Sequence, residues 1–179
     1  MYTDVLISDG GSSTKLSGRR ARIISRLRAE LNHHPATTEV VLELTRDKKD
    51  HRLVAEFDMN ILVEGHVDAE GAKLVVNWWT HPPGYDDQFK FHYVESTGYD
   101  CGWHRQPHPD ESEIPFDHFQ QRASPDGEYE YQGVDFQENT PAGLVWEVTT
   151  TRLERIIRSR YDSDFDACSR SLPTICEAR

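Results

Sequence analysis

The fold is decided by residues 73–105, whose sequence is KLVVNWWTHPPGYDDQFKFHYVESTGYDCGWHR. Apolar and polar residues alternate in three runs, and turn-forming residues that include glycine separate each run from the next. Alternation with a period of two is typical of strands that bury one face, and such short links favour antiparallel pairing. We therefore predict three neighbouring antiparallel strands, at Lys73 to Thr80, Phe89 to Glu95 and Tyr99 to Arg105.

Further strands are predicted on both sides of this stretch. Residues 39–45 alternate, residues 46–50 form a polar turn, and residues 53–67 hold enough apolar side chains for one long strand or two short ones. Residues 106–127 include four prolines and show little periodicity, so we expect an irregular loop there, followed by an edge strand within residues 128–136. The prediction is an antiparallel meander of about five or six strands.

One helix is predicted at each end of the meander. Apolar residues recur at helical spacing between Ser17 and Pro35, and Thr140-Pro141 suits a helix N-cap followed by a first-turn proline. Residues 145–151 suit a strand as well as a helix, so the start of the second helix stays open. The fold class is α+β. The expected organisation is a mobile segment at residues 1–16, a single domain at residues 17–161, and a polar, flexible tail at residues 162–179.

The charge balance limits the classes of function. The chain carries 20 Lys and Arg against 31 Asp and Glu, a net charge of -11, and residues 36–151 alone hold 8 cations and 23 anions. This balance disfavours a protein that binds nucleic acid through its overall charge. No apolar run approaches the roughly 18 residues that span a bilayer, and no apolar stretch follows the first Met as in a signal peptide. We expect a cytoplasmic protein with no membrane partner.

The kinds of cation and the cysteines add two expectations. Arginine supplies 15 of the 20 cations, and an acidic, lysine-poor composition is typical of proteins from salt-loving archaea. At molar salt the Debye length is roughly 3 Å, so the acidic charge would repel a nucleic acid much less there. The three cysteines show neither zinc-site nor disulfide-scaffold spacing, so we expect reduced thiols and a core position for Cys101.

Histidine is the residue type that most suggests chemistry. Nine are present, and five of them fall within residues 81–118. A histidine pair can act as general base and general acid, because an unperturbed pKa near 6.5 leaves both protonation states accessible at neutral pH. His104 and Arg105 are candidate substrate-binding residues, since a guanidinium can bind phosphate.

Two other interpretations of these histidines stay open. They can be hydrogen-bonded or solvated residues of the sheet, or three of them can hold a divalent ion with Asp110 or Asp117. No HExxH or similar motif is present, so we expect neither a metal nor another cofactor.

The first predicted helix carries a basic face that can meet phosphates or an acidic partner protein. The alternative is a solvated face that pairs with the acidic middle of the same chain. The candidate partner-binding residues are Arg19, Arg20, Arg22, Arg26 and Arg28.

Motifs in the middle of the chain resemble the TumE family of small toxins from toxin-antitoxin systems. The family has a Tyr-His-aromatic strand, a short glycine turn, an aromatic strand that leads to Pro-His-His-Pro, and a final cluster that contains Phe, Pro and His. The matching segments here are Phe89-Lys90-Phe91-His92-Tyr93, Gly98, Trp103, Pro107-His108-Pro109 and Pro115-Phe116-Asp117-His118. The layout is similar over roughly residues 35–160.

The resemblance implies roles for His92, His108 and His118, which fall at the family's histidine positions. This sequence departs from the family at His104-Arg105, where the family has Asp-Asn, and it keeps only a single histidine in each of the two later clusters. The resemblance implies an antitoxin partner and makes an attack on RNA plausible. The first hypothesis is thus a ribonuclease toxin in which His108 and His118 act as acid and base and His92 orients the substrate. The alternative is a non-enzymatic module that docks a partner through the basic helix.

Overall fold

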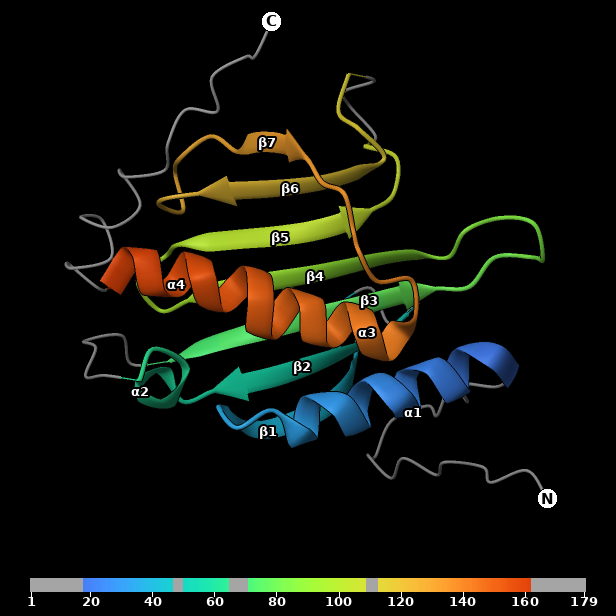
Figure 1. The fold of residues 1–179 in the computed structure, drawn as a ribbon, viewed down its shortest axis with the longest axis horizontal. Coiled ribbons are helices and arrows are strands. Elements are labelled where there is room, and N and C mark those ends of the chain that lie inside the picture. The colour runs from blue at the N-terminus through green and yellow to red at the C-terminus, as the bar shows by residue number, and fades with distance from the viewer. Residues whose placement is uncertain (1–17, 47–49, 65–70, 109–112, 162–179) are drawn as a thin grey trace, which may run out of the picture.

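A seven-stranded antiparallel sheet forms the centre of the protein (Figure 1). The structure is a computed structural model that describes residues 18–46, 50–64, 71–108 and 113–161. Strand order follows chain order, so each strand pairs with its neighbours in the sequence, as the short links predict. The strands are β1 (Thr37–Leu44), β2 (His51–Phe57), β3 (Ala72–Trp79), β4 (Gln88–Glu95), β5 (Asp100–Arg105), β6 (Asp117–Arg122) and β7 (Glu130–Gly133).

Two segments differ from the prediction. Residues 106–127 contain β6, whose backbone pairs with β5 although Phe119 is its only apolar side chain. In residues 53–67 the strand ends at Phe57 and a short helix, α2 (Met59–Leu62), follows. The Asp58 carboxylate caps α2 by accepting a 2.9 Å hydrogen bond from the Asn60 amide. The sheet therefore has seven strands instead of five or six.

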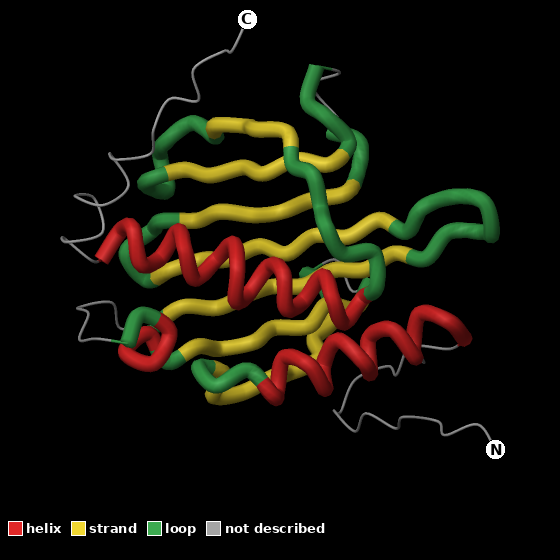
Figure 2. The backbone as a smooth tube through the Cα atoms, viewed as in Figure 1, coloured by secondary structure: helices red, strands yellow, loops and turns green. Residues whose placement is uncertain are grey.

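Two helical segments lie against the same face of the sheet (Figures 1 and 2). The first, α1 (Gly18–His33), contacts β1, β2 and β3. The second crosses the middle of the sheet and begins at Pro141, where the predicted N-cap Thr140 accepts a 3.1 Å hydrogen bond from the Gly143 amide. Its parts are α3 (Pro141–Trp146), the π-helix η1 (Glu147–Leu153) and α4 (Glu154–Tyr161). Residues 145–151, left open between strand and helix, are thus helical.

The core lies between these helices and the sheet. Leu27 of α1, Phe91 of β4, Trp103 of β5 and Ile157 of α4 are at most 2% exposed. Cys101 also lies in this core as a free thiol, as predicted, and burial raises its pKa to about 12. Figure 1 shows that β6 and β7 extend beyond the helices.

The predicted mobile segment at residues 1–16 and the predicted tail at residues 162–179 fall outside the described residues. Within the described part of the chain, none of the helices has the length and apolar character needed to cross a membrane.

Candidate functional site

Strand alternation gives the sheet a covered face, which packs against the helices, and an open face on the other side. In β4 the side chains of Phe89, Phe91 and Tyr93 point into the core, so those of Lys90 and His92 point to the open face. Side chains from all seven strands line a groove of about 620 Å³ on the open face. The core side chains build the sheet, and the residues between them build this groove.

Four histidines lie next to one another along the open face. His92, His104 and His118 come from the adjacent strands β4, β5 and β6, and their ring centroids are 5.9 Å apart for the first pair and 5.1 Å apart for the second. His108 follows β5, and its ring lies 6.3 Å from that of His118 and 5.3 Å from that of Tyr131 in β7. The structure brings together the three histidines that the family resemblance singles out, with His104 among them.

The four histidines differ in their access to the groove. His92, His104 and His108 line it, whereas His118 is fully buried and does not. His108 is half-buried, and its Nε2 atom lies 3.3 Å from the Tyr131 hydroxyl. A molecule in the groove would therefore meet His92 and His108 directly, whereas His104, at 3% exposure, and His118 are buried beside them.

A glycine makes room for two of the rings. Gly102 stands opposite His92 in the ladder between β4 and β5. A Cβ atom at Gly102 would lie 2.8 Å from His92 Nδ1 and 2.7 Å from His104 Nε2. Real Cβ atoms essentially never approach other atoms this closely. The rings of His92 and His104 can therefore lie this close to the β5 backbone only because residue 102 is glycine.

Within this row of four histidines, three buried ring nitrogens have no hydrogen-bond partner among the described residues: both nitrogens of His104 and Nε2 of His118. The other His118 nitrogen, Nδ1, lies 2.8 Å from the Pro115 carbonyl oxygen. Because a carbonyl only accepts, this contact assigns the proton of His118 to Nδ1 and leaves a lone pair on Nε2. A buried polar atom without a partner costs about 1–3 kcal/mol, so these nitrogens are a local source of instability in the fold.

Burial lowers the pKa of the histidines in the strands. For His104, burial together with the nearby charge of Lys90 and the other rings lowers the pKa to about 2. Burial is also the main cause that lowers the pKa of His118 and of His92. In His92 the Asp100 carboxylate opposes this effect. At neutral pH the three rings are therefore uncharged in the free protein.

His92 has a carboxylate partner on β5. His92 Nε2 lies 3.5 Å from Asp100 Oδ1, and Asp100 Oδ2 accepts a 2.6 Å hydrogen bond from Arg122. Asp100 is only 3% exposed. The negative charge of Asp100 therefore favours the imidazolium form of His92 and raises its pKa, against the larger effect of burial.

The groove is locally basic although the chain is acidic. Its lining holds Arg52, Lys73 and Lys90 but a single carboxylate, that of Glu43. Glu43 and Arg52 pair with each other at 3.0 Å, which leaves the two lysine charges uncompensated within the lining. Burial lowers the pKa of Lys90, whose ammonium has no ion-pair partner in the described part of the chain.

Lys90, Gly102 and Tyr131 belong to this site, and sequence reasoning missed them. The alternation of β4 places Lys90 on the same face as His92, and the alternation of β5 does the same for Gly102 and His104. These two could have been found by counting in steps of two from each histidine. Tyr131 could not, because its place depends on the pairing of β6 with β7.

Arg105 lies on the other face, away from the histidines with which it was predicted to bind phosphate. Its guanidinium donates hydrogen bonds of 2.8 Å to each carboxylate oxygen of Asp117, and these bonds raise its pKa. The same guanidinium lies over the rings of Phe89 and Phe136. The predicted partner His104 points the opposite way, into the groove.

The arginines of α1 divide into paired and unpaired groups. Arg19 pairs with Asp87, Arg20 pairs with Asp50, and Arg26 pairs with Glu30 of its own helix. The pairs of Arg19 and Arg20 match the alternative in which the basic face meets the acidic middle of the chain. Two further arginines, Arg22 and Arg28, are exposed and have no partner among the described residues.

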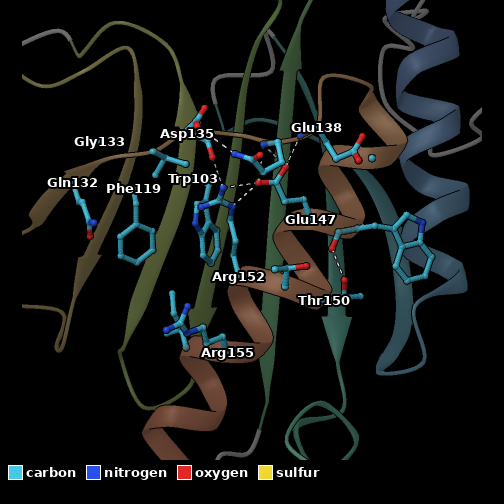
Figure 3. Close-up of a pocket in the computed structure, with 16 residues that line it drawn as sticks. Trp103, Phe119, Gln132, Gly133, Asp135, Glu138, Glu147, Thr150, Arg152 and Arg155 are labelled. Carbon is cyan, nitrogen blue, oxygen red and sulfur yellow. Dashed lines mark hydrogen bonds and ion pairs between the residues drawn. The ribbon is translucent and has the colours of Figure 1, made fainter. Parts of the chain in front are cut away.

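A second groove, of about 980 Å³, lies on the covered face between the C-terminal helix and β5 to β7 (Figure 3). Its central carboxylate, Glu147, accepts hydrogen bonds from Arg152 and from the backbone amides of Gln137 and Glu138. These bonds fasten the link between β7 and α3 to η1. The lining contains neither histidine nor cysteine, so this larger groove offers less acid-base chemistry than the open face.

The described residues contain no group of three or more His, Cys, Asp or Glu side chains arranged to hold a metal ion.

Comparison with known proteins supports the resemblance noted in the sequence. A family model described as Toxin TumE matches residues 27–153, a range that runs from within α1 to the end of η1 and includes all four histidines of the open face. Neither the curated proteins nor the solved structures contain a match to the chain. The match covers most of the chain, and the chain therefore belongs to the TumE family of toxins from toxin-antitoxin systems.

Proposed function

We propose that this TumE toxin binds RNA in the groove of the open face and cleaves it by acid-base catalysis with histidines. The observation that carries the proposal is the composition of the groove, which combines three histidines and the cations Arg52, Lys73 and Lys90 with one carboxylate in a chain of net charge -11. A nucleic acid backbone requires local cations, and cleavage of a phosphodiester requires groups that move protons. Both lie in the same groove.

The aromatic and amide side chains of the groove also suit single-stranded RNA. Tyr129 and Tyr131 of the β7 side line it, and Gln106 and Gln120 offer amide groups to base edges. Single-stranded bases stack on aromatic rings over sheet surfaces, because their faces are free.

In the proposed reaction, His108 takes the proton of a ribose 2′-hydroxyl, and the 2′-oxygen attacks the adjacent phosphorus. The bond from phosphorus to the 5′-oxygen breaks, and His92 gives that oxygen a proton. The products are a 2′,3′-cyclic phosphate and a 5′-hydroxyl. Asp100 supports the charged form of His92, and half-buried His108 can reach the substrate directly. Each proton transfer of this kind contributes about 10²–10⁴-fold to the rate.

The burial of His118 gives it a different role from the one that the resemblance implies. Its ring contacts the rings of His104 and His108, and its Nδ1 atom donates a hydrogen bond to the Pro115 carbonyl. We assign His118 as a positioning residue and His92 and His108 as the proton-transfer pair. No metal ion takes part in the scheme.

Cleavage of RNA by purified variants tests the proposal. The wild type is expected to cut single-stranded RNA in the presence of a chelator, and His108→Ala is expected to lose at least about 10²-fold in rate. His33→Ala is the matched control, since His33 is exposed at the end of α1. Equal rates for wild type and His108→Ala, or loss of cutting on chelation, would contradict the scheme. Growth arrest on induced expression provides the parallel readout in cells.

We also propose that the antitoxin docks on α1 through Arg22 and Arg28. These arginines are exposed and unpaired among the described residues, so an acidic antitoxin segment would not have to displace an intrachain ion pair. Arg22→Glu with Arg28→Glu is expected to weaken binding of the antitoxin and to leave RNA cleavage unchanged. If instead the arginine variants abolish growth arrest while the histidine variants retain it, the docking function replaces the catalytic one.

A further inference from the structure

Lys90 belongs to a polar row that crosses the open face of the sheet. In the strand ladder it pairs with Asn77 of β3 on one side and with His104 of β5 on the other. The next residue of this row is His118 of β6, and His92 lies two residues along β4 on the same face. Residues that pair directly across antiparallel strands have Cβ atoms about 4.5–5.5 Å apart. The side chain of Lys90 therefore begins next to two of the four histidines.

The ammonium group of Lys90 lies close enough to the histidine row to act on several rings. Its charge is among the causes that lower the pKa of His92, His104 and His118. Charges that are fully in water act on one another weakly, because water screens them. An effect on three rings from three strands therefore places this ammonium group beside the histidines and not out in the solvent.

This ammonium group is partly buried and still open to the groove. Burial lowers the pKa of Lys90, and the residue lines the groove. The ammonium has no ion pair or hydrogen bond with the described residues, and it is not one of the buried polar atoms without a partner, so it is accessible. The only carboxylate of the groove lining, that of Glu43, pairs with Arg52 at 3.0 Å. The charge of Lys90 is thus available to an anion in the groove.

We propose that Lys90 is a catalytic residue, whose ammonium contacts a non-bridging oxygen of the phosphodiester that is cleaved and stabilises the charge that develops there. The inference rests on the proposed function and adds to it a group that stabilises the transition state. When the 2′-oxygen bonds to phosphorus and the 5′-oxygen has not yet left, the non-bridging oxygens carry more negative charge than in the substrate. Lys90 keeps its proton throughout, and the proton transfers remain those of His92 and His108.

The position of Lys90 suits this role better than those of the other cations in the groove. Arg52 is already paired with Glu43, and Lys73 is exposed and pairs in the ladder with Val94 instead of a histidine. Electrostatic interactions strengthen where water is excluded, and a cation that is held in place before the reaction needs no reorganisation during it. Lys90 is therefore the cation whose loss should slow the reaction step most.

Two measurements on Lys90→Gln separate stabilisation of the transition state from simple binding. One is the rate of single-turnover cleavage of single-stranded RNA at saturating protein. The other is the affinity for a 2′-O-methyl RNA oligonucleotide, which carries the same phosphodiesters but cannot be cleaved through its 2′-oxygen. We expect the rate to fall at least about 10²-fold and the affinity to fall less than about tenfold. A saturating rate that falls no more than the affinity would overturn the inference.

Three further variants isolate the charge of Lys90. Arg155→Gln is the control for a loss of positive charge, since Arg155 is exposed on α4 and away from the open face, and it should change neither quantity. Lys73→Gln is expected to lower the affinity, and a loss of rate as large as that of Lys90→Gln would overturn the assignment. Lys90→Arg keeps the charge and guards against a loss that comes from the fold. It should retain more than about a tenth of the wild-type rate, and a rate as low as that of Lys90→Gln would contradict a role for the charge.

Binding of uridine vanadate separates this inference from the proposed function, because this ester imitates five-coordinate phosphorus and binds whether or not RNA is cut. Lys90→Gln should weaken its binding at least about tenfold more than it weakens binding of the oligonucleotide. If this difference is found but the wild type does not cut RNA, the contact of Lys90 with the phosphoryl group stands and the catalytic proposal fails. If the wild type cuts RNA and Lys90→Gln cuts it equally fast, the catalytic proposal stands and the role of Lys90 fails.

Discussion

On the covered face of β4, Phe91 is fully buried beside Trp103 of the next strand, while on the open face the neighbouring residue His92 lies beside His104 and an uncovered groove. Both residues belong to the same strand and the same ladder. The covered face consists mainly of apolar side chains that exclude water. The open face carries ring nitrogens, and the ammonium group of Lys90, that have no partner among the described residues. The comparison indicates that the covered face supplies most of the stability, and the open face is where we place the proposed chemistry.

The largest expected difference between the two faces is the loss of stability when Phe91 or His92 is replaced by alanine. Phe91→Ala removes a fully buried ring from the centre of the core, so we expect the free energy of unfolding to fall by about 3–5 kcal/mol. His92→Ala, at a partly exposed position, should change it by less than about 1 kcal/mol. Urea unfolding monitored by tryptophan fluorescence measures both. Similar losses for the two variants would show that the open face also holds the fold together.

The next largest effect is acid lability that originates on the open face. The pKa of His104 is about 2 in the folded protein and near 6.5 in the unfolded chain, so below pH 6.5 only the unfolded chain binds this proton. The stability supplied by neutral His104 is complete above about pH 6.5 and is lost as the pH falls. At pH 5 the loss from this residue is about 2 kcal/mol.

Urea unfolding at pH 7.5 and pH 5 measures this loss. His104→Gln is expected to flatten the pH dependence, whereas His33→Gln, on an exposed position of α1, should keep it. A pH dependence that is the same in His104→Gln and in the wild type would show that His104 is not its source.

The same comparison explains how much of the fold the sequence predicts. The core strands are predictable because their covered face is apolar and aromatic, so alternation is visible in β3, β4 and β5. In β6 the open-face residues His118 and Gln120 are polar, and only Phe119 on the other side is apolar, so the pattern is too weak to detect. Its position follows from pairing with β5, which is a tertiary effect.

Two helical segments, α2, which the sequence pattern misses, and η1, which it leaves open between strand and helix, have local causes. Met59 and Leu62 belong to the apolar run of residues 53–67, which predicts a strand. A single helix-capping residue, Asp58, is a weaker signal in the sequence than this run. In η1 the β-branched residue Thr149 would suit a strand, but its hydroxyl donates a 2.8 Å hydrogen bond to the Val145 carbonyl. This bond satisfies the hydroxyl within the helix.

For the candidate site, residue types were predictable and the choice of face was not. The density of histidine in residues 81–118 points to the segment whose histidines lie together in the structure, but adjacency in sequence also groups Arg105 with His104. Adjacent residues of a strand point to opposite faces. Arg105 therefore pairs with Asp117 on the covered face, and Lys90 is the cation beside the histidines.

A smaller effect should distinguish two aspartates that each pair with an arginine, one on each face. Asp100→Asn removes the charge that raises the pKa of His92, so the proton donor is less populated at neutral pH. We expect about a tenfold loss of RNA cleavage at pH 7 and a shift of the limb of the pH-rate profile that reports the acid to lower pH. Asp117→Asn breaks the ion pair with Arg105 on the covered face and should leave the profile in place. Equal shifts of the pH-rate profile in the two variants would contradict the assignment of Asp100 as the carboxylate that supports His92.

The smallest effect concerns the salt dependence of RNA binding, and its sign separates the charge of the groove from the charge of the whole chain. If the net charge of -11 governs the encounter, salt screens repulsion and the affinity for RNA rises with salt. If the cations of the groove govern it, binding releases counterions and the affinity falls with salt.

We expect the affinity to fall with salt, and we expect Lys90→Gln to reduce the slope of log affinity against log salt by about 0.7, the contribution of one phosphate contact to single-stranded nucleic acid. Arg105→Gln removes an equal charge from the covered face and should leave the slope unchanged, because the guanidinium is already paired with Asp117. Fluorescence anisotropy with a labelled 2′-O-methyl oligonucleotide measures both slopes. If the affinity rises with salt, or if both variants change the slope equally, the net charge of the chain governs RNA binding. That result would contradict the assignment of the open face as the binding surface.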